Sequence, residues 1–333
     1  QAEDGIRDSV ASRGLGDVYK RQDIDGLPLT EETRLDFASK NGAMHACGHD
    51  GHVSILLETA RILNSLKDSF KGEIILCFQP AEEIVQGALA MIDDGLFDDY
   101  HPERVIGLHI WNQLPSGFVG VNDSAVFASA DAFSLEVKGR GGHGALPHLN
   151  IDPIVAASHI ISNAQTIVSR EISPQDPGVL TFGKIESGFA PNIIPDTVSI
   201  EGTIRAYSQE VREKIYSSLE RISKLSAESM RSTANTEIMY GAGPVVNEQE
   251  VASWVRDKAR EVLDDSLVGP TEPVSVGDDM AEFLQRIPGV YFLLGASVGN
   301  KYPHHNTKFD FDEKAMINGV KVFLSCTLDF LNN

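Results

Sequence analysis

Two short apolar runs separated by a helical pattern constrain the fold of this 333-residue chain most strongly. The first run, at residues 73–79 (EIILCFQ), is rich in strand-forming residues and stops at Pro80. The second run covers residues 104–111 (RVIGLHIW), and the stretch between the two runs, EEIVQGALAMIDDGLF, predicts a helix that Gly95 closes. A strand, a helix and a second strand in this order predict a parallel α/β sheet, in which ligands gather at the carboxyl ends of the strands.

The rest of the chain adds a helix before these runs and a different pattern after them. Apolar residues at spacings of three and four predict an amphipathic helix at residues 52–66. From about residue 130 the predicted order becomes strand, helix, strand, strand, helix, strand, which is typical of a small split βαβ domain. The α/β pattern then returns, with a helix at residues 251–263 and an apolar strand at residues 289–296.

We therefore predict an α/β protein with two domains. The catalytic domain has a mixed, mostly parallel sheet with helices on both faces, and it is built from residues 23–128 and 242–333. The second domain, at residues 129–241, is an inserted α+β domain of the split βαβ, ferredoxin-like type. Residues 1–22 show no clear helical or strand period, so we expect an atypical or truncated N-terminus there.

The composition excludes several classes of protein. The chain has 28 Lys and Arg against 48 Asp and Glu, a net charge of −20, which disfavours nucleic acid and anionic membranes as partners. It contains no run of about 18 apolar residues, so we expect no membrane-spanning segment. Cys47, Cys77 and Cys326 are few and far apart, which is untypical of a disulfide-stabilised secreted protein, so we expect a cytoplasmic protein with Cys77 and Cys326 in its core.

The nonapeptide MHACGHDGH, at residues 44–52, directs attention to chemistry, because it holds a cysteine and three histidines just before a predicted helix. Alone it is a weak signal, since single Cys and His residues are usually structural. The two predicted strands strengthen it, because one is followed by a pair of glutamates and the other carries a histidine near its end. The candidate site residues are Cys47, His49, Glu82, Glu83, His109 and, near the end of the chain, His305.

This set of side chains suits a metal centre. Thiolate, imidazole and carboxylate are the ligands of Zn²⁺, and Mn²⁺ is tolerated where oxygen ligands contribute. A thiolate or a carboxylate can also bridge two ions about 3.5–4 Å apart. Of two adjacent glutamates, one can bind metal while the other carries a proton, although such pairs are more often solvated helix starts.

Seven motifs in a fixed order carry a resemblance to a known family. They are DIDGLP, MHACGHDGH, FQPAEE, GLHIW, GRGGHGALPH, PNIIPD and HHNTKFDF, and they extend over residues 23–333. In this order they resemble the dinuclear metallo-amidohydrolases of the aminoacylase and carboxypeptidase superfamily. Within it, they are most similar to the branch of hippurate hydrolases and indole-3-acetyl-amino acid hydrolases.

The resemblance implies a role for each residue of the candidate centre. It makes Cys47 the bridging ligand, Glu82 the general base and Glu83 a ligand. The implied metal ligands are Cys47, His49, Glu83, His109 and His305. They would hold two divalent ions per subunit, Mn²⁺ or Zn²⁺.

The resemblance also assigns residues around the metals and in the inserted domain. Asp23 and Asp25 would support the ligands. His143 would reach into the site of a partner subunit and stabilise the oxyanion, which implies a homodimer through the inserted domain, with higher assembly left open. Asn192 and Arg205 would hold the carboxylate of the substrate, for which an arginine fork is also physically suited.

Other residues near the motifs have weaker expectations. Asp50 matches a residue that orients a ligand, whereas we expect His45 and His52 to be loop or helix-start residues. The chain departs from the motifs of the family at Gly144, at Thr307 and at residues 277–280 (GDDM).

Together these features predict a metal-dependent amidohydrolase. It would cleave the amide bond of N-acyl amino acids, such as hippurate-like, N-acetyl or indole-acetyl conjugates, with a metal-activated water and Glu82 as general acid and base. Two alternatives stay open. One is a cysteine hydrolase with Cys47 as nucleophile and His49 or His109 as base, and the other is a non-catalytic relative that binds metal.

Overall fold

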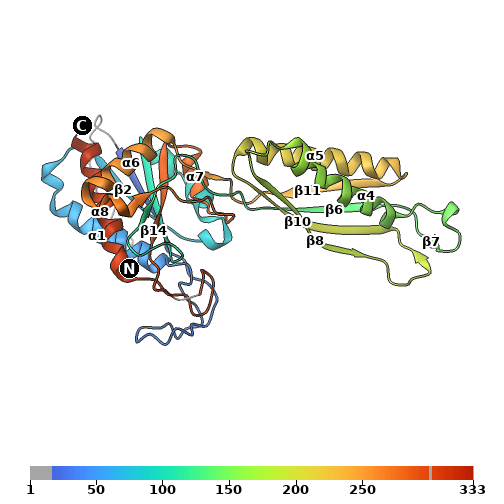
Figure 1. Cartoon of the computed structure of the whole chain (residues 1–333), viewed down its shortest axis with the longest axis horizontal. Coiled ribbons are helices and arrows are strands. Elements are labelled where there is room, and N and C mark those ends of the chain that lie inside the picture. Colours follow the sequence, from blue (N-terminus) through green and yellow to red (C-terminus); the bar gives the residue numbers. More distant parts are fainter. Residues whose placement is uncertain (1–16, 300–301, 333) are drawn as a thin grey trace. The chain divides into compact units, whose positions relative to one another are not determined.

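A computed structural model describes residues 17–299 and 302–332, and it forms two compact units (Figure 1). Unit 1 comprises the chain up to Ser124, Asn247–Thr271 and the chain from Glu282 onward. Unit 2 comprises Ala125–Val246 and Glu272–Ala281. The predicted division placed residues 125–128, 242–246 and 272–281 in the catalytic domain, whereas in the structure they belong to unit 2.

Unit 1 is built around a six-stranded sheet with the order β13-β4-β14-β3-β1-β2. All neighbouring strands are parallel except β14 and β4, which are antiparallel. The strands are β1 (Asp17–Asp23), β2 (Glu73–Gln79), β3 (Arg104–Trp111), β4 (Val119–Gly120), β13 (Val268–Gly269) and β14 (Gly289–Gly295). The mixed, mostly parallel sheet of the prediction is therefore confirmed.

Helices cover both faces of this sheet. On one face α1, α6 and α8 pack beside one another (Figure 1), and Lys20 of β1 points to the ring of Phe323 in α8. On the other face the ring of Tyr19 contacts Phe97 of α3 and Phe283 of α7. The helices are α1 (His49–Ser65), α2 (Gly87–Asp93), α3 (Leu96–Asp99), α6 (Gln249–Val262), α7 (Met280–Leu284) and α8 (Met316–Asn332). Across residues 17–299 and 302–332, the helices are too short or too polar to cross a membrane.

The helix expected between β2 and β3 is interrupted. A 3-10 turn, η2 (Glu82–Ile84), precedes α2, and Gly95, with a φ of 94°, separates α2 from the short α3. A Cβ on Gly87 would lie 1.6 Å from the carbonyl oxygen of Pro80, so α2 can start there only because the residue is glycine. The 3-10 turn that holds the two glutamates is therefore a separate element that precedes α2.

Helix α1 begins three residues earlier than expected, at His49. Gly48 precedes it with a φ of 87°, a left-handed conformation that glycine adopts without strain. The first turn of the helix therefore holds both His49 and His52, while Cys47 lies in the loop before it.

Unit 2 confirms the predicted order of strand, helix, strand, strand, helix, strand. Its elements are β6 (Asp131–Lys138), α4 (Pro153–Thr166), β8 (Gly178–Ser187), β10 (Thr197–Ala206), α5 (Gln209–Ser229) and β11 (Thr233–Met239). The sheet is antiparallel with the order β11-β6-β10-β8, and the apolar sides of α4 and α5 pack against it. Short strand pairs complete the unit, namely β5 (Ala125–Phe127) with β12 (Val245–Val246) and β7 (Gly142–His143) with β9 (Ile193–Ile194).

Strand β1 corrects the expectation for the start of the chain. Part of that stretch, residues 1–16, lies outside the described residues, but Asp17–Asp23 forms a parallel strand between β2 and β3. The strand was not predicted because Lys20, Arg21 and Gln22 are polar, yet all three are fully buried. Charged side chains are rarely fully buried without a partner, so a central strand with this composition is unusual.

Lys20 has the least favourable environment of these residues. Its Nζ is buried without a hydrogen-bond partner in the described part of the chain, 5.3 Å from the centre of the Phe323 ring. Burial lowers the pKa of Lys20 to about 8 from its ordinary value of 10.5, although the nearby Cys326 acts in the opposite direction. The protonated side chain is therefore less favourable in the folded protein than in the unfolded chain.

Replacing Lys20 with methionine should stabilise unit 1. The difference between the ordinary pKa and the folded-state pKa corresponds to about 3 kcal/mol at pH 7. Because the pKa is lower in the folded state, the unfolded chain binds the extra proton between about pH 8 and pH 10.5, and the stability of the unsubstituted protein rises across that window. The gain from Lys20→Met should thus be largest below pH 8 and vanish above pH 10.5.

Urea unfolding followed by tryptophan fluorescence measures this effect, because Trp111 and Trp254 both lie in unit 1. Lys67→Met is the matched control, since Lys67 is exposed and its replacement should change little at any pH. If Lys20→Met and the unsubstituted protein have the same free energy of unfolding at pH 7, burial of the Lys20 charge does not destabilise unit 1.

Candidate metal centre

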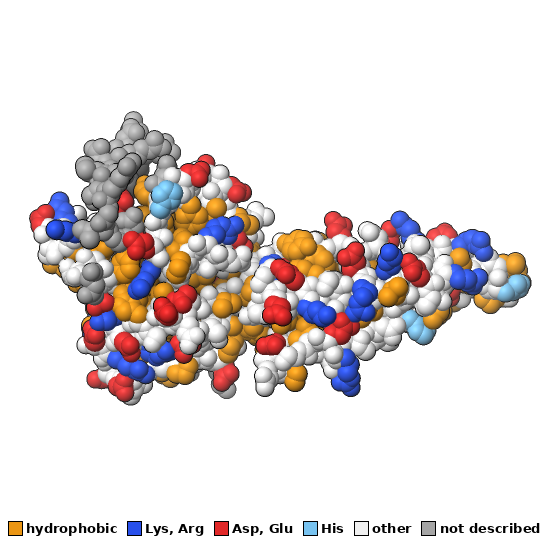
Figure 2. Space-filling view, turned by 90° about the horizontal axis from the view of Figure 1, so that it is seen from above, with side chains coloured by type: hydrophobic (Ala, Val, Ile, Leu, Met, Phe, Trp, Pro, Cys, Tyr) orange, Lys and Arg blue, Asp and Glu red, His pale blue; other side chains and the backbone are white. Residues whose placement is uncertain are grey.

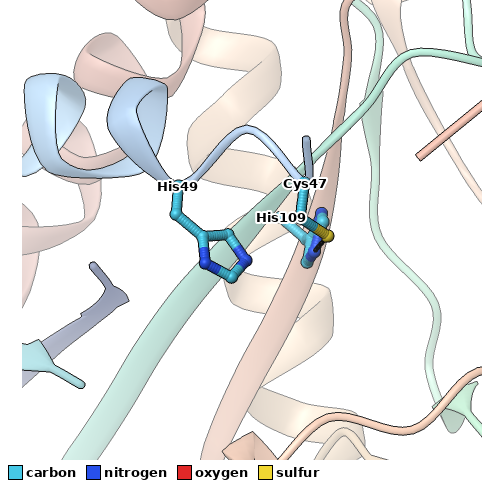
Figure 3. A group of neighbouring side chains, drawn as sticks. All are labelled: Cys47, His49 and His109. Carbon is cyan, nitrogen blue, oxygen red and sulfur yellow. Dashed lines mark hydrogen bonds between the residues drawn. The ribbon is translucent and has the colours of Figure 1, made fainter. Parts of the chain in front are cut away.

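The structure brings all six candidate site residues together at the carboxyl-end rim of the sheet in unit 1. Figure 3 shows the side chains of Cys47, His49 and His109 approaching one another from the loop before α1, from the start of α1 and from β3. Their ligand atoms lie within 4.8 Å of one another, and so do those of two further groups that consist only of candidate site residues. These are Cys47 with Glu83 and His305, and His49 with Glu82 and Glu83.

Cys47 belongs to two of these groups. Its sulfur is close to His49 and His109 in one group and to Glu83 and His305 in the other. A thiolate that belongs to both groups could be shared by two cations. The donor set of sulfur, imidazole nitrogen and carboxylate oxygen is that of Zn²⁺, with Mn²⁺ tolerated.

Backbone carbonyls orient the two buried imidazoles. The Nδ1–H of His49 donates to the carbonyl oxygen of Asp25 at 3.0 Å, and the Nδ1–H of His109 donates to that of Ile110 at 2.6 Å. Each ring therefore turns Nε2 into the site, where His109 Nε2 lies 3.5 Å from the sulfur of Cys47. His49 Nε2 is buried and has no hydrogen-bond partner among the residues described, as expected of an atom that binds metal.

Glu83 and His305 complete the rim. His305 Nε2 lies 3.2 Å from Glu83 Oε2, while Glu83 Oε1 is buried without a hydrogen-bond partner in the described ranges. The Glu83 N–H donates to Asp25 Oδ2 at 2.9 Å, which fixes this residue after the turn at Ala81. Ala81 and His305 both adopt left-handed backbone conformations, with φ of 58° and 66°. Such conformations are uncommon in non-glycine residues and are typical of functional sites.

Acidic side chains give the site a negative potential. Burial alone would lower the pKa of His49, but the carboxylates of Asp23, Asp25 and Glu83 outweigh it and raise the pKa to about 9. Burial holds the pKa of His109 well below its usual range, so this ring is neutral and offers a lone pair on Nε2. The potential that favours a proton on His49 also favours a metal cation in its place.

His52 has contacts that the sequence analysis did not anticipate. It lies at the helix start, as expected, but its ring is fully buried, with Nδ1–H donating to the Asp23 carboxylate and Nε2 accepting from the Ile110 N–H at 2.8 Å. Asp23, His49 and His52 also form a close group. Because both ring nitrogens of His52 are already hydrogen-bonded, this group lacks a third ligand atom.

His304 is a second residue that the sequence analysis passed over. Its Nε2–H donates to the Ile110 carbonyl at 3.0 Å, and its ring stacks on Trp111 with centres 4.5 Å apart. The only available sequence signal was the doubled histidine that it forms with His305. By contrast, Asp50 is exposed and accepts a hydrogen bond from the Gly51 N–H, so the structure does not bring it to the ligand groups.

The remaining predicted site residues lie in unit 2. His143 is an exposed residue of β7, and Asn192 directly precedes β9, which pairs with β7. Arg205 is half-buried on β10, where its guanidinium donates to the carbonyl oxygens of Asp131 and Ile204. Cys77 and Cys326 are both buried, as expected of core residues.

Comparisons with known proteins identify the family. The model of peptidase family M20/M25/M40 matches residues 20–329. The chain is 40% identical to an N-acetyl-L-cysteine deacetylase of Bacillus subtilis, covering 94% of this chain and 74% of that protein. It is 38% identical to an N-acetyldiaminopimelate deacetylase of Lactococcus lactis, covering 97% of this chain and 84% of that protein.

Solved structures agree with these relatives. An aminohydrolase structure from methicillin-resistant Staphylococcus aureus superimposes with a TM-score of 0.90 at 35% identity, covering 96% of this chain and 82% of that one. A dinuclear metal-binding peptidase of the M20 family from Bacillus subtilis gives a TM-score of 0.82 at 30% identity, covering 97% and 84%. The chain therefore belongs to peptidase family M20/M25/M40 and is a metallo-hydrolase of that family.

Proposed function

We propose that the protein hydrolyses the amide bond of N-acyl amino acids at a centre of two divalent metal ions. The observation that carries the proposal is the sulfur of Cys47, which belongs to two groups of potential ligands at once. The buried Nε2 of His49 and Oε1 of Glu83, both without hydrogen-bond partners in the described part of the chain, support it further. The proposed ligands are Cys47, His49, Glu83, His109 and His305.

The residues present fit such a pair of ions, Mn²⁺ or Zn²⁺. When bound, these ions lower the pKa of a water molecule and polarise the carbonyl of the substrate. Within the protein, Asp25 and Ile110 hold the two imidazoles in the tautomer that exposes Nε2. Asp23 supports the centre by adding negative charge near His49.

Glu82 is the proposed general base and acid. It is only 6% exposed, and its Oε2 lies 3.9 Å from His49 Nε2, beside the ligand groups. Glu83, the neighbouring carboxylate, is engaged with His305 and Asp25, so the two glutamates are suited to different tasks. Glu82 would take a proton from the attacking water and pass it to the leaving amine.

Replacing Glu82 with glutamine should abolish turnover without emptying the centre. The amide has nearly the shape of the carboxylate but cannot accept the proton, so kcat should fall by about 100-fold or more. Metal content measured by atomic absorption should stay at the level of the unsubstituted protein. A Glu82→Gln variant with near-normal kcat would show that another group is the base.

The class of substrate follows from the relatives. Two of them are named as deacetylases of N-acetyl amino acids, and a third is named as a carboxypeptidase. These names support an amide substrate with a small acyl group and a free carboxylate, so N-acetyl conjugates are the first choice. Hippurate-like and indole-acetyl conjugates are the alternatives that the sequence motifs suggest. Figure 2 shows Lys and Arg side chains interspersed with Asp and Glu on the face that is drawn, which agrees with a small-molecule substrate.

A hydrolysis panel combined with chelation tests both the substrate and the role of metal. N-acetyl, N-benzoyl and indole-acetyl amino acids are offered to the protein as purified, after chelation, and after reconstitution with Mn²⁺ or Zn²⁺. We expect chelation to abolish hydrolysis and reconstitution to restore it, with the N-acetyl substrates turned over fastest. Activity that survives chelation would instead favour the cysteine hydrolase with Cys47 as nucleophile.

His143 is proposed to stabilise the oxyanion from a second subunit. Its Nδ1 accepts a hydrogen bond from the Ala145 N–H at 3.1 Å, so in the neutral ring the proton is on the exposed Nε2. An exposed residue that can donate an N–H is what an oxyanion in another subunit requires. Asn192 is held beside it, since its carbonyl accepts from the Gly144 N–H at 2.9 Å, and together with Arg205 it is proposed to bind the substrate carboxylate.

A homodimer through unit 2 is part of this proposal. Leu146, Leu149 and Phe189 are 45%, 57% and 87% exposed, which is unusual for side chains of this size on a monomer. In addition, β8 is an edge strand of the unit 2 sheet among the residues described, and an edge strand can pair with a strand of another chain. Both features are suited to contact with a second copy of the chain.

Mixed dimers test whether His143 acts across the subunit boundary. Glu82→Gln and His143→Ala homodimers should each be nearly inactive. After dissociation and random reassociation, half of the dimers are mixed and each has one complete site, so about a quarter of the normal activity should return. If His143 serves the site of its own chain, mixing will restore nothing.

A further inference from the structure

Strands β1 and β3 separate just before they reach the metal centre. They are paired from Val18 and Arg104 to Arg21 and Gly107, and the pairing ends there. Beyond this point both strands lead to site residues, since β1 runs on to Asp23 and β3 runs on to His109. Each strand end stays paired with its other neighbour, β1 with β2 up to Asp23 and β3 with β14 up to Trp111, but direct backbone pairing between β1 and β3 stops before the centre.

The ring of His52 connects the two strand ends. It comes from the first turn of α1, and its two nitrogens bind one group from each strand end. Nδ1–H donates to the carboxylate of Asp23, and Nε2 accepts from the N–H of Ile110 at 2.8 Å. The side chain is fully buried, so no water competes for these bonds.

The Ile110 peptide connects His52 to a proposed ligand. Its N–H is bound by His52, and its carbonyl accepts from Nδ1 of His109 at 2.6 Å. On the other side, His49 lies one helical turn before His52 on α1. The His52 ring thus links the start of α1 directly to the end of β3.

We propose that His52 is a positioning residue of the metal centre, which holds the ends of β1 and β3 and the start of α1 in the arrangement that the ligands need. The inference rests on the proposed metal centre, and it adds a residue that provides no ligand atom. Loss of either hydrogen bond would let His109 or His49 shift relative to Cys47. Partners of ligands that act in this way typically contribute roughly 10- to 100-fold to metal affinity.

Three substitutions separate the two hydrogen bonds. The amide of asparagine replaces Nδ1, so His52→Asn keeps the bond to Asp23 and loses the bond to Ile110. The longer amide of glutamine replaces Nε2, so His52→Gln keeps the bond to Ile110 and loses the bond to Asp23. His52→Phe loses both. The control is Ile55→Ala on the same helix, which removes a buried apolar side chain without a polar contact.

Calorimetric titration of the metal-free full-length variants with Mn²⁺ alone provides the readout, alongside urea unfolding. His52→Asn and His52→Gln should each bind Mn²⁺ about 10-fold more weakly than the unsubstituted protein, and His52→Phe more weakly still. Ile55→Ala should lose stability but keep its Mn²⁺ affinity. If His52→Phe does not fold, the asparagine and glutamine variants still decide the question.

Two outcomes would overturn the inference. One is normal Mn²⁺ affinity in His52→Asn and His52→Gln, and the other is an equal loss of affinity in Ile55→Ala, which would indicate a general effect of destabilisation. Failure of the unsubstituted protein to bind Mn²⁺ or Zn²⁺ is a different result, because it would contradict the proposed function itself.

Discussion

Asp25 determines the geometry of the candidate centre, because two elements are oriented by this one residue. Its backbone carbonyl accepts from Nδ1 of His49, and its carboxylate accepts from the N–H of Glu83. The start of α1 and the turn after β2 are thereby held against the end of β1. A parallel sheet brings the carboxyl ends of its strands to one rim, but only such contacts bring individual ligand atoms within reach of an ion.

Most of the fold could be predicted from the sequence, because apolar residues recur at strand or helix spacing in most of the elements that face the core. The runs that became β2, β3 and β14, and the six elements of unit 2, follow this rule. Strand β1 does not, because Lys20, Arg21 and Gln22 give no apolar pattern although all three are fully buried. The helix expected after Pro80 was interrupted by a backbone contact with Gly87, which no local pattern reveals.

The chemistry of the site was predictable to a similar extent. Motifs indicated the residues whose side chains reach the rim, because Cys, His and Glu next to strand ends are conspicuous. His52 gave no such signal, since its partners Asp23 and Ile110 lie 29 and 58 residues away and only the fold brings them together. The same holds for His304, whose partner carbonyl lies 194 residues away. Residues that orient the metal ligands are therefore harder to predict from sequence than the ligands themselves.

The insertion of unit 2 has a consequence for biosynthesis. In the sheet of unit 1, β14 lies between β3 and β4, yet along the chain all of β5 to β12 separates it from both. A ribosome thus releases a nearly complete unit 2 while the central position of the other sheet is still empty. Until β14 emerges, the edges of β3 and β4 that pair with it have no partner strand there, and this interval is when a nascent chain of this topology most needs protection from aggregation.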